Sequence, residues 1–455
     1  MLKPTILKNG LTVLKVPKAG SRVTLIGFVT TTGSSMEEGY FPQGISHLIE
    51  RLFWCGTDKH TSTRSLNVTL EGMGGNFTSI TSQELTGFYM IVPEYHQYKA
   101  LSMLAEVIQR SYFDTRDIDR EKKGLIDQLK IQTENMEMEE DFLTVSNLYL
   151  NSSLGQPVQG TVESISAITQ ENILEYLAHQ YQPNKSYLIL GGSFESKPLM
   201  ELVEQEWSAW NPRVKKFIEP MDFHPEDIGE LPRIIYRQKG ISHTYLVVSF
   251  LLDEGMRPKI LINNEKSEKK VEVDYQKLQD QTLKKHATLI VLNALLGQGL
   301  SSRLWSKTVE EEMLFNRVLS SVVKLKQTGY LQISGQIENS LFSFGLESVL
   351  TVLEAFKKTT VSINELAKAK EYLKGKMILD QEDIVSSTFW LIENLIGSGL
   401  NFDMEDLVST IEKVEAPEIR ALANDLFTPE KLIITTLGTA KETRLVEKLI
   451  KKYIG

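Results

Sequence analysis

The sequence has almost no cysteine: Cys55 is the only one in 455 residues. An intramolecular disulfide is therefore impossible, which agrees with a reducing compartment. No hydrophobic run approaches the roughly 20 residues of a membrane-spanning helix, and the N-terminus has no apolar run of signal-peptide length. These absences predict a cytoplasmic protein that has no membrane partner.

Positive charge is also scarce relative to negative charge. The chain has 50 lysines and arginines against 59 aspartates and glutamates, a net charge of −9. This balance argues against nucleic acid as a partner. The hydrophobic share of 41% and the charged share of 24% are those of an ordinary globular protein, and the length suggests roughly two to four structural units.

The first half of the chain reads as strands, then helices, then a strand and a helix. Asn9-Gly10 between two apolar runs predicts a tight hairpin turn, and Thr169 is a suitable N-cap for a later helix. Period-2 and period-3.6 patterns predict strands at 23–31, 76–82, 85–92 and 186–190, and helices around His47, at 97–109, from 114 into the 140s, from 169 and up to 207.

The second half repeats this order, and one segment repeats in sequence. Tyr181-Gln-Pro-Asn-Lys185 and Phe427-Thr-Pro-Glu-Lys431 both precede a strand, with Gly192 and Gly438 eleven residues after the aromatic residue. An internal duplication explains both. We therefore predict an α+β protein with two homologous half-domains, each a mostly antiparallel sheet covered by helices.

A linker and an insertion interrupt this plan. Residues 211–232 contain four prolines and predict an interdomain linker, which divides the chain into an N-terminal half-domain, 1–210, and a C-terminal half-domain, 233–455. A polar run from about 254 to 285 predicts a surface insertion.

The most informative motif is His47-Leu-Ile-Glu50-Arg51. With a histidine at position 51 it would be the inverted zinc motif H-x-x-E-H, in which two imidazoles one helical turn apart bind the metal. A guanidinium stays protonated and offers only donors, so Arg51 has no lone pair for a metal ion.

Several segments in a fixed order show a resemblance to a known family. They are Gly33-Ser34 with Glu37, Gly44, residues 47–57, residues 72–82, Gly160-Thr161 and Tyr181-Gln-Pro-Asn184. Over almost its whole length the chain resembles the pitrilysin/insulinase (M16) zinc peptidases, which also include mitochondrial processing peptidase and the core subunits of the respiratory bc1 complex. The resemblance implies a fold of the LuxS/MPP-like metallohydrolase type.

The resemblance also assigns roles to the motif. His47 would be the first zinc ligand and Glu50 the general base, whereas Arg51 replaces the second ligand. In relatives the third ligand comes from a helix with the pattern E-x6-E. Glu121 matches the first glutamate of this pattern, a remnant that supports the ligands without binding the metal, and Gln128 stands at the ligand position. A neutral amide is a poor zinc ligand, so no zinc cofactor is expected here, in contrast to active relatives.

Without a metal, these residues are predicted to persist as a hydrogen-bonded remnant. We expect Arg51 to take the place of the metal charge and to pair with Glu50, Glu121 or Asp127, because an uncompensated carboxylate cluster is costly to bury. Cys55 lies on the His47 face of the helix, but roughly 12 Å along it, too far to share a metal.

The substrate-binding signature of the family is altered as well. In relatives, a Ser-Ser-Arg-Leu run is followed by an R-x6-Y pair whose arginine and tyrosine hold the substrate. The run is present here at 301–304, but Val309 and Asn316 stand at the positions of the arginine and the tyrosine, so the clamp is degenerate. In relatives, the substrate also adds as a strand to a sheet edge. The corresponding candidates here are Gly75, Asn76, Phe77 and Thr78, although Phe77 stands where a small residue is usual and would obstruct the edge.

Together these changes predict a catalytically inactive peptidase homologue, and no enzyme on its own. The leading hypothesis is the non-catalytic subunit of a heterodimeric peptidase, paired with an active M16-type subunit and binding or enclosing peptide substrates. One alternative is a homodimeric peptide-binding or scaffold protein formed by self-association. Another is an active zinc metalloendopeptidase with an unorthodox site.

Overall fold

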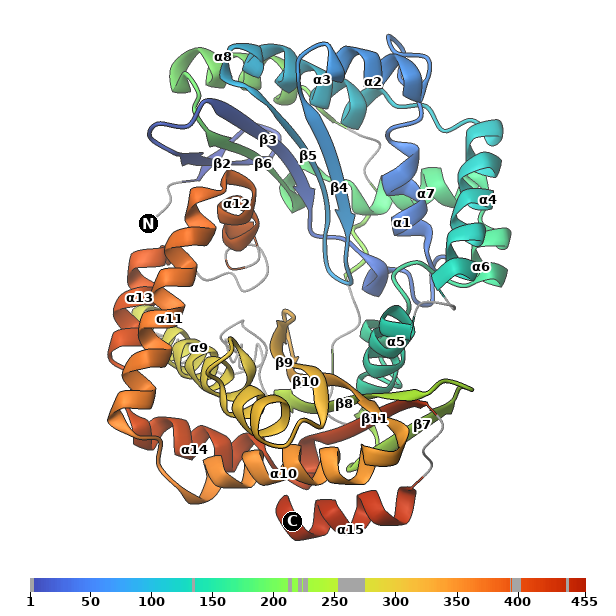
Figure 1. Ribbon diagram of the computed structural model, residues 1–455. Coiled ribbons are helices and arrows are strands. Elements are labelled where there is room, and N and C mark those ends of the chain that lie inside the picture. The colour runs from blue at the N-terminus through green and yellow to red at the C-terminus, as the bar shows by residue number, and fades with distance from the viewer. Residues whose placement is uncertain are drawn as a thin grey trace, which may run out of the picture. The chain divides into compact units, whose positions relative to one another are not determined.

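The computed structural model describes residues 4–132, 136–211, 215–219, 223, 228–252, 275–392, 394, 402–438 and 442–455. The chain forms two compact units. Unit 1 comprises Met1–Asn135, Asn151–Asp222 and Asp383–Trp390, and unit 2 comprises Met136–Leu150, Phe223–Glu382 and Leu391–Gly455. Figure 1 labels the elements along the chain.

Unit 1 contains a six-stranded sheet in the order β1-β2-β6-β3-β5-β4. Only the β2–β6 pair is parallel, and the β1–β2 pair is the expected hairpin, with Gly10 at a φ of 94° in its turn. In the described part of the chain, β4 pairs with β5 and with no other strand, so it is an edge strand. The strands are β1 (Thr5–Ile6), β2 (Thr12–Pro17), β3 (Val23–Thr30), β4 (Asn76–Thr81), β5 (Thr86–Pro93) and β6 (Ser186–Gly192).

Helices cover this sheet and bury a continuous apolar core against it. The core joins α1 to the strands through side chains such as Ile49, Phe28 and Phe88, and Phe28 stacks on Trp207 at 5.7 Å between ring centroids. The helices of this unit are α1 (Ile45–Leu52), α2 (Thr63–Glu71), α3 (Gln97–Arg110), α4 (Thr115–Gln132), α6 (Val162–Ala167), α7 (Gln170–Gln180) and α8 (Ser196–Trp207). Thr169 caps α7 as predicted.

Unit 2 contains a five-stranded sheet in the order β7-β11-β8-β10-β9. Its β7–β11 pair is parallel and its other pairs are antiparallel, so it repeats the order and directions of β2-β6-β3-β5-β4 in unit 1. This repetition in topology matches the repeated sequence segment. The strands are β7 (Arg233–Gln238), β8 (His243–Leu252), β9 (Phe315–Lys324), β10 (Gly329–Glu338) and β11 (Leu432–Gly438).

The helices of unit 2 complete an α+β fold with two helix-covered sheets. Besides α5, which is described below, they are α9 (Tyr275–Gly297), α10 (Phe342–Lys358), α11 (Ile363–Glu382), α13 (Met404–Glu412), α14 (Ala416–Leu426) and α15 (Thr443–Tyr453). Of the polar run predicted as an insertion, residues 275–285 form the first half of α9, and the part up to residue 274 lies outside the described residues. No helix among the described residues is long and apolar enough to span a membrane.

Two segments depart from a division of the chain at 211–232. Helix α5 (Met136–Leu148) belongs to unit 2, where Glu139 pairs with Arg237 at 3.0 Å and with Lys239 at 2.7 Å. Most of α12 (Ile384–Ile392) belongs to unit 1, where the Phe389 ring packs on Tyr89 with centroids 4.7 Å apart. Each sheet is therefore packed against a helix from the other half of the sequence.

Candidate functional site

The site is built on α1, and a buried acid fixes where this helix begins. Gly44 precedes α1 with a φ of 84°, and its N–H donates to Glu37 at 2.7 Å. The N–H and hydroxyl of Ser46 donate to the same carboxyl group at 2.9 and 2.6 Å, and the Tyr176 hydroxyl lies 2.7 Å from that of Ser46. Complete burial raises the pKa of Glu37 to about 8, against the opposing effect of these donors.

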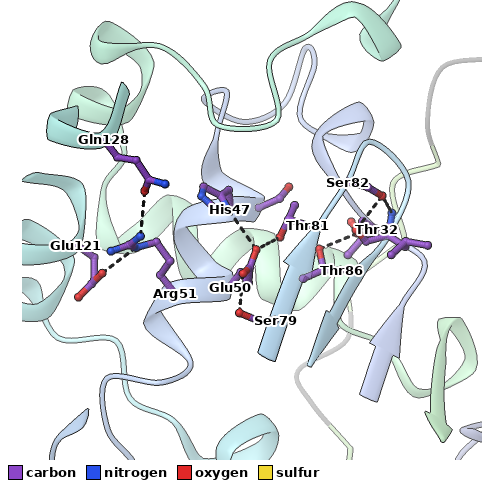
Figure 2. Close-up of polar contacts among 12 residues, drawn as sticks. Thr32, His47, Glu50, Arg51, Ser79, Thr81, Ser82, Thr86, Glu121 and Gln128 are labelled. Atoms are coloured by element: carbon purple, nitrogen blue, oxygen red, sulfur yellow. Dashed lines mark hydrogen bonds and ion pairs between the residues drawn. The ribbon is translucent and has the colours of Figure 1, made fainter. Parts of the chain in front are cut away.

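His47 and Glu50 lie one turn apart on α1, and Figure 2 shows them hydrogen-bonded to each other beside β4. The Nδ1 atom of His47 is 3.1 Å from Oε2 of Glu50. Two strand hydroxyls donate to the carboxylate, Ser79 at 2.6 Å and Thr81 at 2.5 Å. Burial by itself would raise the pKa of Glu50, but the hydrogen bonds from these three residues outweigh it and lower the pKa.

Arg51 extends from the same helix toward α4, where it meets both predicted positions of the E-x6-E pattern. Its Nε donates to Glu121 at 2.9 Å, and its Nη1 donates to Gln128 at 3.3 Å (Figure 2). Glu121 and Gln128 share one face of α4 because seven residues make two helical turns. The expected pairing of Arg51 with an acidic neighbour is confirmed for Glu121. Asp127 instead pairs with Lys130 at 3.4 Å.

The donor set does not fit a zinc ion. Three protein ligands with lone pairs are needed, but Arg51 has none, and the Gln128 carbonyl oxygen already accepts a bond from Arg51. Of the three ligand positions, only that of His47 keeps an available ligand atom, because its Nε2 is buried without a hydrogen-bond partner in the described structure. Across the described residues, no group of three His, Cys, Asp or Glu side chains is placed to hold a metal ion.

Cys55 does not supply a substitute ligand. Its thiol is buried at the end of the α1 segment, 3.3 Å from Nη2 of Arg120. Burial raises the pKa of the thiol to about 12. Because the thiolate is the form that binds metals, a thiol with so high a pKa is a poor ligand at neutral pH.

The predicted peptide-binding residues lie at the start of the edge strand. Gly74 has a φ of 62° in the preceding turn, and a Cβ on Gly75 would lie 2.8 Å from side-chain atoms of both Leu70 and Val92, so a larger residue there would displace them. Asn76 and Thr78 are exposed. Phe77 does not extend freely from the strand: its ring stacks on Trp54, with centroids 3.8 Å apart and planes 11° apart.

The two positions of the substrate clamp lie in unit 2. Val309 is half-buried in a π-helical segment, Trp305–Glu311, and Asn316 is exposed near the start of β9. Neither side chain carries the charge or the phenol expected in relatives. Arg303 donates two hydrogen bonds to Glu365, at 2.7 and 2.9 Å, and lies over the Phe356 ring.

Sequence reasoning identified the helix residues of the site but missed its strand residues. Ser79 and Thr81 contact Glu50 because alternate residues of β4 face α1. The alternation itself is visible in the sequence, but it does not show which face of the strand meets the helix. The hydrogen-bond network of Glu37, Ser46 and Tyr176 was likewise missed, because Glu37 and Tyr176 are 139 residues apart in the sequence.

Comparison with known proteins finds relatives over most of the chain. The model of the insulinase family, peptidase family M16, matches residues 12–162, and the model described as "Peptidase M16 inactive domain" matches residues 167–373. An uncharacterised zinc protease of Bacillus subtilis, YmxG, is 25% identical over 94% of this chain and 97% of its own length. The beta subunit of the mitochondrial-processing peptidase of Dictyostelium discoideum is 28% identical over 45% of this chain and 44% of its own.

Solved structures show the same fold. The crystal structure of a protease from Helicobacter pylori superposes with a TM-score of 0.83 at 19% identity and covers 96% of this chain and 99% of its own. The family models account for most of the chain and include both the altered motif on α1 and the Ser-Ser-Arg-Leu run of unit 2. The chain therefore belongs to the M16, or insulinase, family of peptidases.

Proposed function

We propose that this chain is a catalytically inactive M16 homologue that works in the cytoplasm as the non-catalytic subunit of a heterodimeric peptidase. In this assembly the partner is an M16-type subunit with an intact zinc motif, and the present chain helps to bind or enclose the peptide substrate. The observation that carries the proposal is the guanidinium of Arg51, which is bonded to Glu121 and Gln128.

Three features support the loss of independent hydrolysis. The guanidinium of Arg51 pairs with the α4 carboxylate of Glu121, and a positive charge there opposes metal binding electrostatically as well as by lacking a lone pair. Glu50 is engaged by three donors. In unit 2, Val309 and Asn316 replace the side chains that hold substrate in relatives. The name of the Dictyostelium relative, a subunit of a processing peptidase, supports an assembly of unlike chains.

The edge strand supports retained peptide binding. Pairing of an extended peptide with a strand edge depends on backbone N–H and C=O groups more than on side chains. Along the described chain, β4 uses only one of its two edges. The replaced ligand positions, Arg51 and Gln128, lie on α1 and α4 and not on β4.

Zinc content and turnover test the proposal directly. We expect the purified wild-type chain to contain far less than one zinc per chain and to leave a mixed peptide pool uncut. The double reversion R51H/Q128E should bind zinc, because it restores the imidazole and the carboxylate beside His47. The matched control R51K/Q128E restores only the carboxylate and should not. Stoichiometric zinc with turnover in the wild-type chain would refute the proposal.

Assembly is tested by co-expression with an M16 homologue that carries an intact H-x-x-E-H motif. We expect a mixed complex whose peptide hydrolysis exceeds that of the homologue alone. A stable homodimer that ignores the homologue would instead favour the peptide-binding or scaffold role without a catalytic partner.

A further inference from the structure

One face of the edge strand β4 contacts α1 and the turn that follows this helix. Phe77, Ser79 and Thr81 alternate with the exposed residues Asn76, Thr78 and Ile80. The Phe77 ring stacks on Trp54, whose indole N–H donates to Asn67 at 2.7 Å. Ser79 and Thr81 follow at two-residue intervals, and both donate to Glu50. Three successive inward-facing residues of β4 therefore contact the helical layer.

Glu50 is the centre of this connection because its buried charge needs donors. The residue is 6% exposed, and a buried carboxylate without hydrogen bonds is very costly. The neighbouring cation, Arg51, points to Glu121 instead. Within the described structure, the donors to Glu50 are therefore His47 from its own helix and the two hydroxyls from β4. Moving β4 away from α1 would take both strand hydroxyls from the Glu50 carboxylate and leave a buried charge with too few hydrogen bonds. The cost of that state opposes any separation of strand and helix.

We infer that Glu50 is now a positioning residue: with Ser79 and Thr81 it forms an anchor that holds the free edge strand in place as a template for an extended peptide. The anchor gives a reason for an acidic side chain at this position in a chain that lacks two of the three zinc ligands expected from its relatives. Its link to peptide binding rests on the proposed function, whereas the anchor itself does not.

An edge strand needs such an anchor because it is bonded on one side only. In the described part of unit 1, β4 has the β5 ladder and no second neighbour. Elements with few supporting contacts open locally at a lower free energy than the core does. A peptide that pairs with β4 gains most when the strand is already extended, since it then does not have to order the strand as it binds.

Hydrogen–deuterium exchange of the β4–β5 amides tests the anchor in the metal-free protein. We expect Thr81→Val, which keeps the shape and removes the hydroxyl, to speed exchange about tenfold. The combination S79A/T81V should speed it further. Thr81→Ser keeps the donor and should exchange at a rate close to that of the wild type. Thr78→Val is the matched control, because it makes the same change on the exposed face of the same strand.

Exchange in the core helix α3 serves as the internal reference. Faster exchange confined to the β4–β5 amides and α1 supports the anchor, whereas equal acceleration in α3 would mean global destabilisation and would overturn it. Equal effects of Thr81→Val and Thr78→Val, or of Thr81→Val and Thr81→Ser, would also overturn it. The result is independent of the zinc and turnover assays, so failure of the anchor and failure of the proposed function are distinguishable.

Discussion

Replacing Arg51 by methionine tests whether the guanidinium stabilises the contact between α1 and α4. The change keeps the length and most of the apolar stem but removes the bonds to Glu121 and Gln128. The Arg51 side chain is 35% exposed and that of Glu121 is 16% exposed, so the pair is neither fully solvated nor fully buried. The contribution of this pair to the free energy of unfolding should therefore be larger than that of a surface ion pair and smaller than that of a buried one.

The surroundings of Glu121 limit the size of the effect. After the substitution, Glu121 still accepts a bond from Nε of Arg120 at 3.3 Å, so it is not left without a cation. We expect Arg51→Met to lower the free energy of unfolding by about 1–2 kcal/mol. For a domain of this size that corresponds to a fall in Tm of about 3–6 °C. Lys123→Met, an exposed change on α4, is the control and should have little effect.

A double-mutant cycle isolates the interaction. Arg51→Met and Glu121→Gln, measured singly and together by chemical denaturation, should show a coupling of about 1 kcal/mol that shrinks in 1 M salt. A coupling of zero, or a Tm unchanged by Arg51→Met, would refute the view that the arginine substitutes structurally for a metal charge.

Three further outcomes follow from the same structure. Because burial raises the pKa of Glu37 from 4.5 to about 8, its contribution to stability is present below pH 4.5 and is lost as the pH rises to about 8. The resulting fall in the free energy of unfolding is at most about 5 kcal/mol. Glu37→Gln should flatten this fall in unfolding curves recorded from about pH 5 to 8.5. Cys55 should resist thiol reagents in the native protein at pH 8 and react only on unfolding, and rapid native labelling would contradict its burial and raised pKa. A chelator should leave the wild-type Tm unchanged and lower that of zinc-loaded R51H/Q128E; a fall for the wild type would reveal a bound metal.

Much of the fold could be predicted because its signals are local. The Asn9-Gly10 turn, the Thr169 cap and the alternation in β4 are each set by neighbouring residues, and the structure contains the hairpin, the capped helix and the strand. Local signals could not predict that α5 belongs to unit 2 and most of α12 to unit 1. An amphipathic helix shows in its sequence that it buries one face, but the sequence does not say which sheet that face covers.

The chemistry of the candidate site divides along the same line. Residue identity alone determines that Arg51 cannot ligate zinc and that Gln128 is a poor ligand, because lone pairs and charge are properties of the side chain itself. Only the tertiary structure decides that Arg51 turns to Glu121 and Gln128, and that Glu50 is held by Ser79 and Thr81. These choices depend on which side chains the packing of α1 against α4 and β4 brings within about 3 Å, the range over which a hydrogen bond acts.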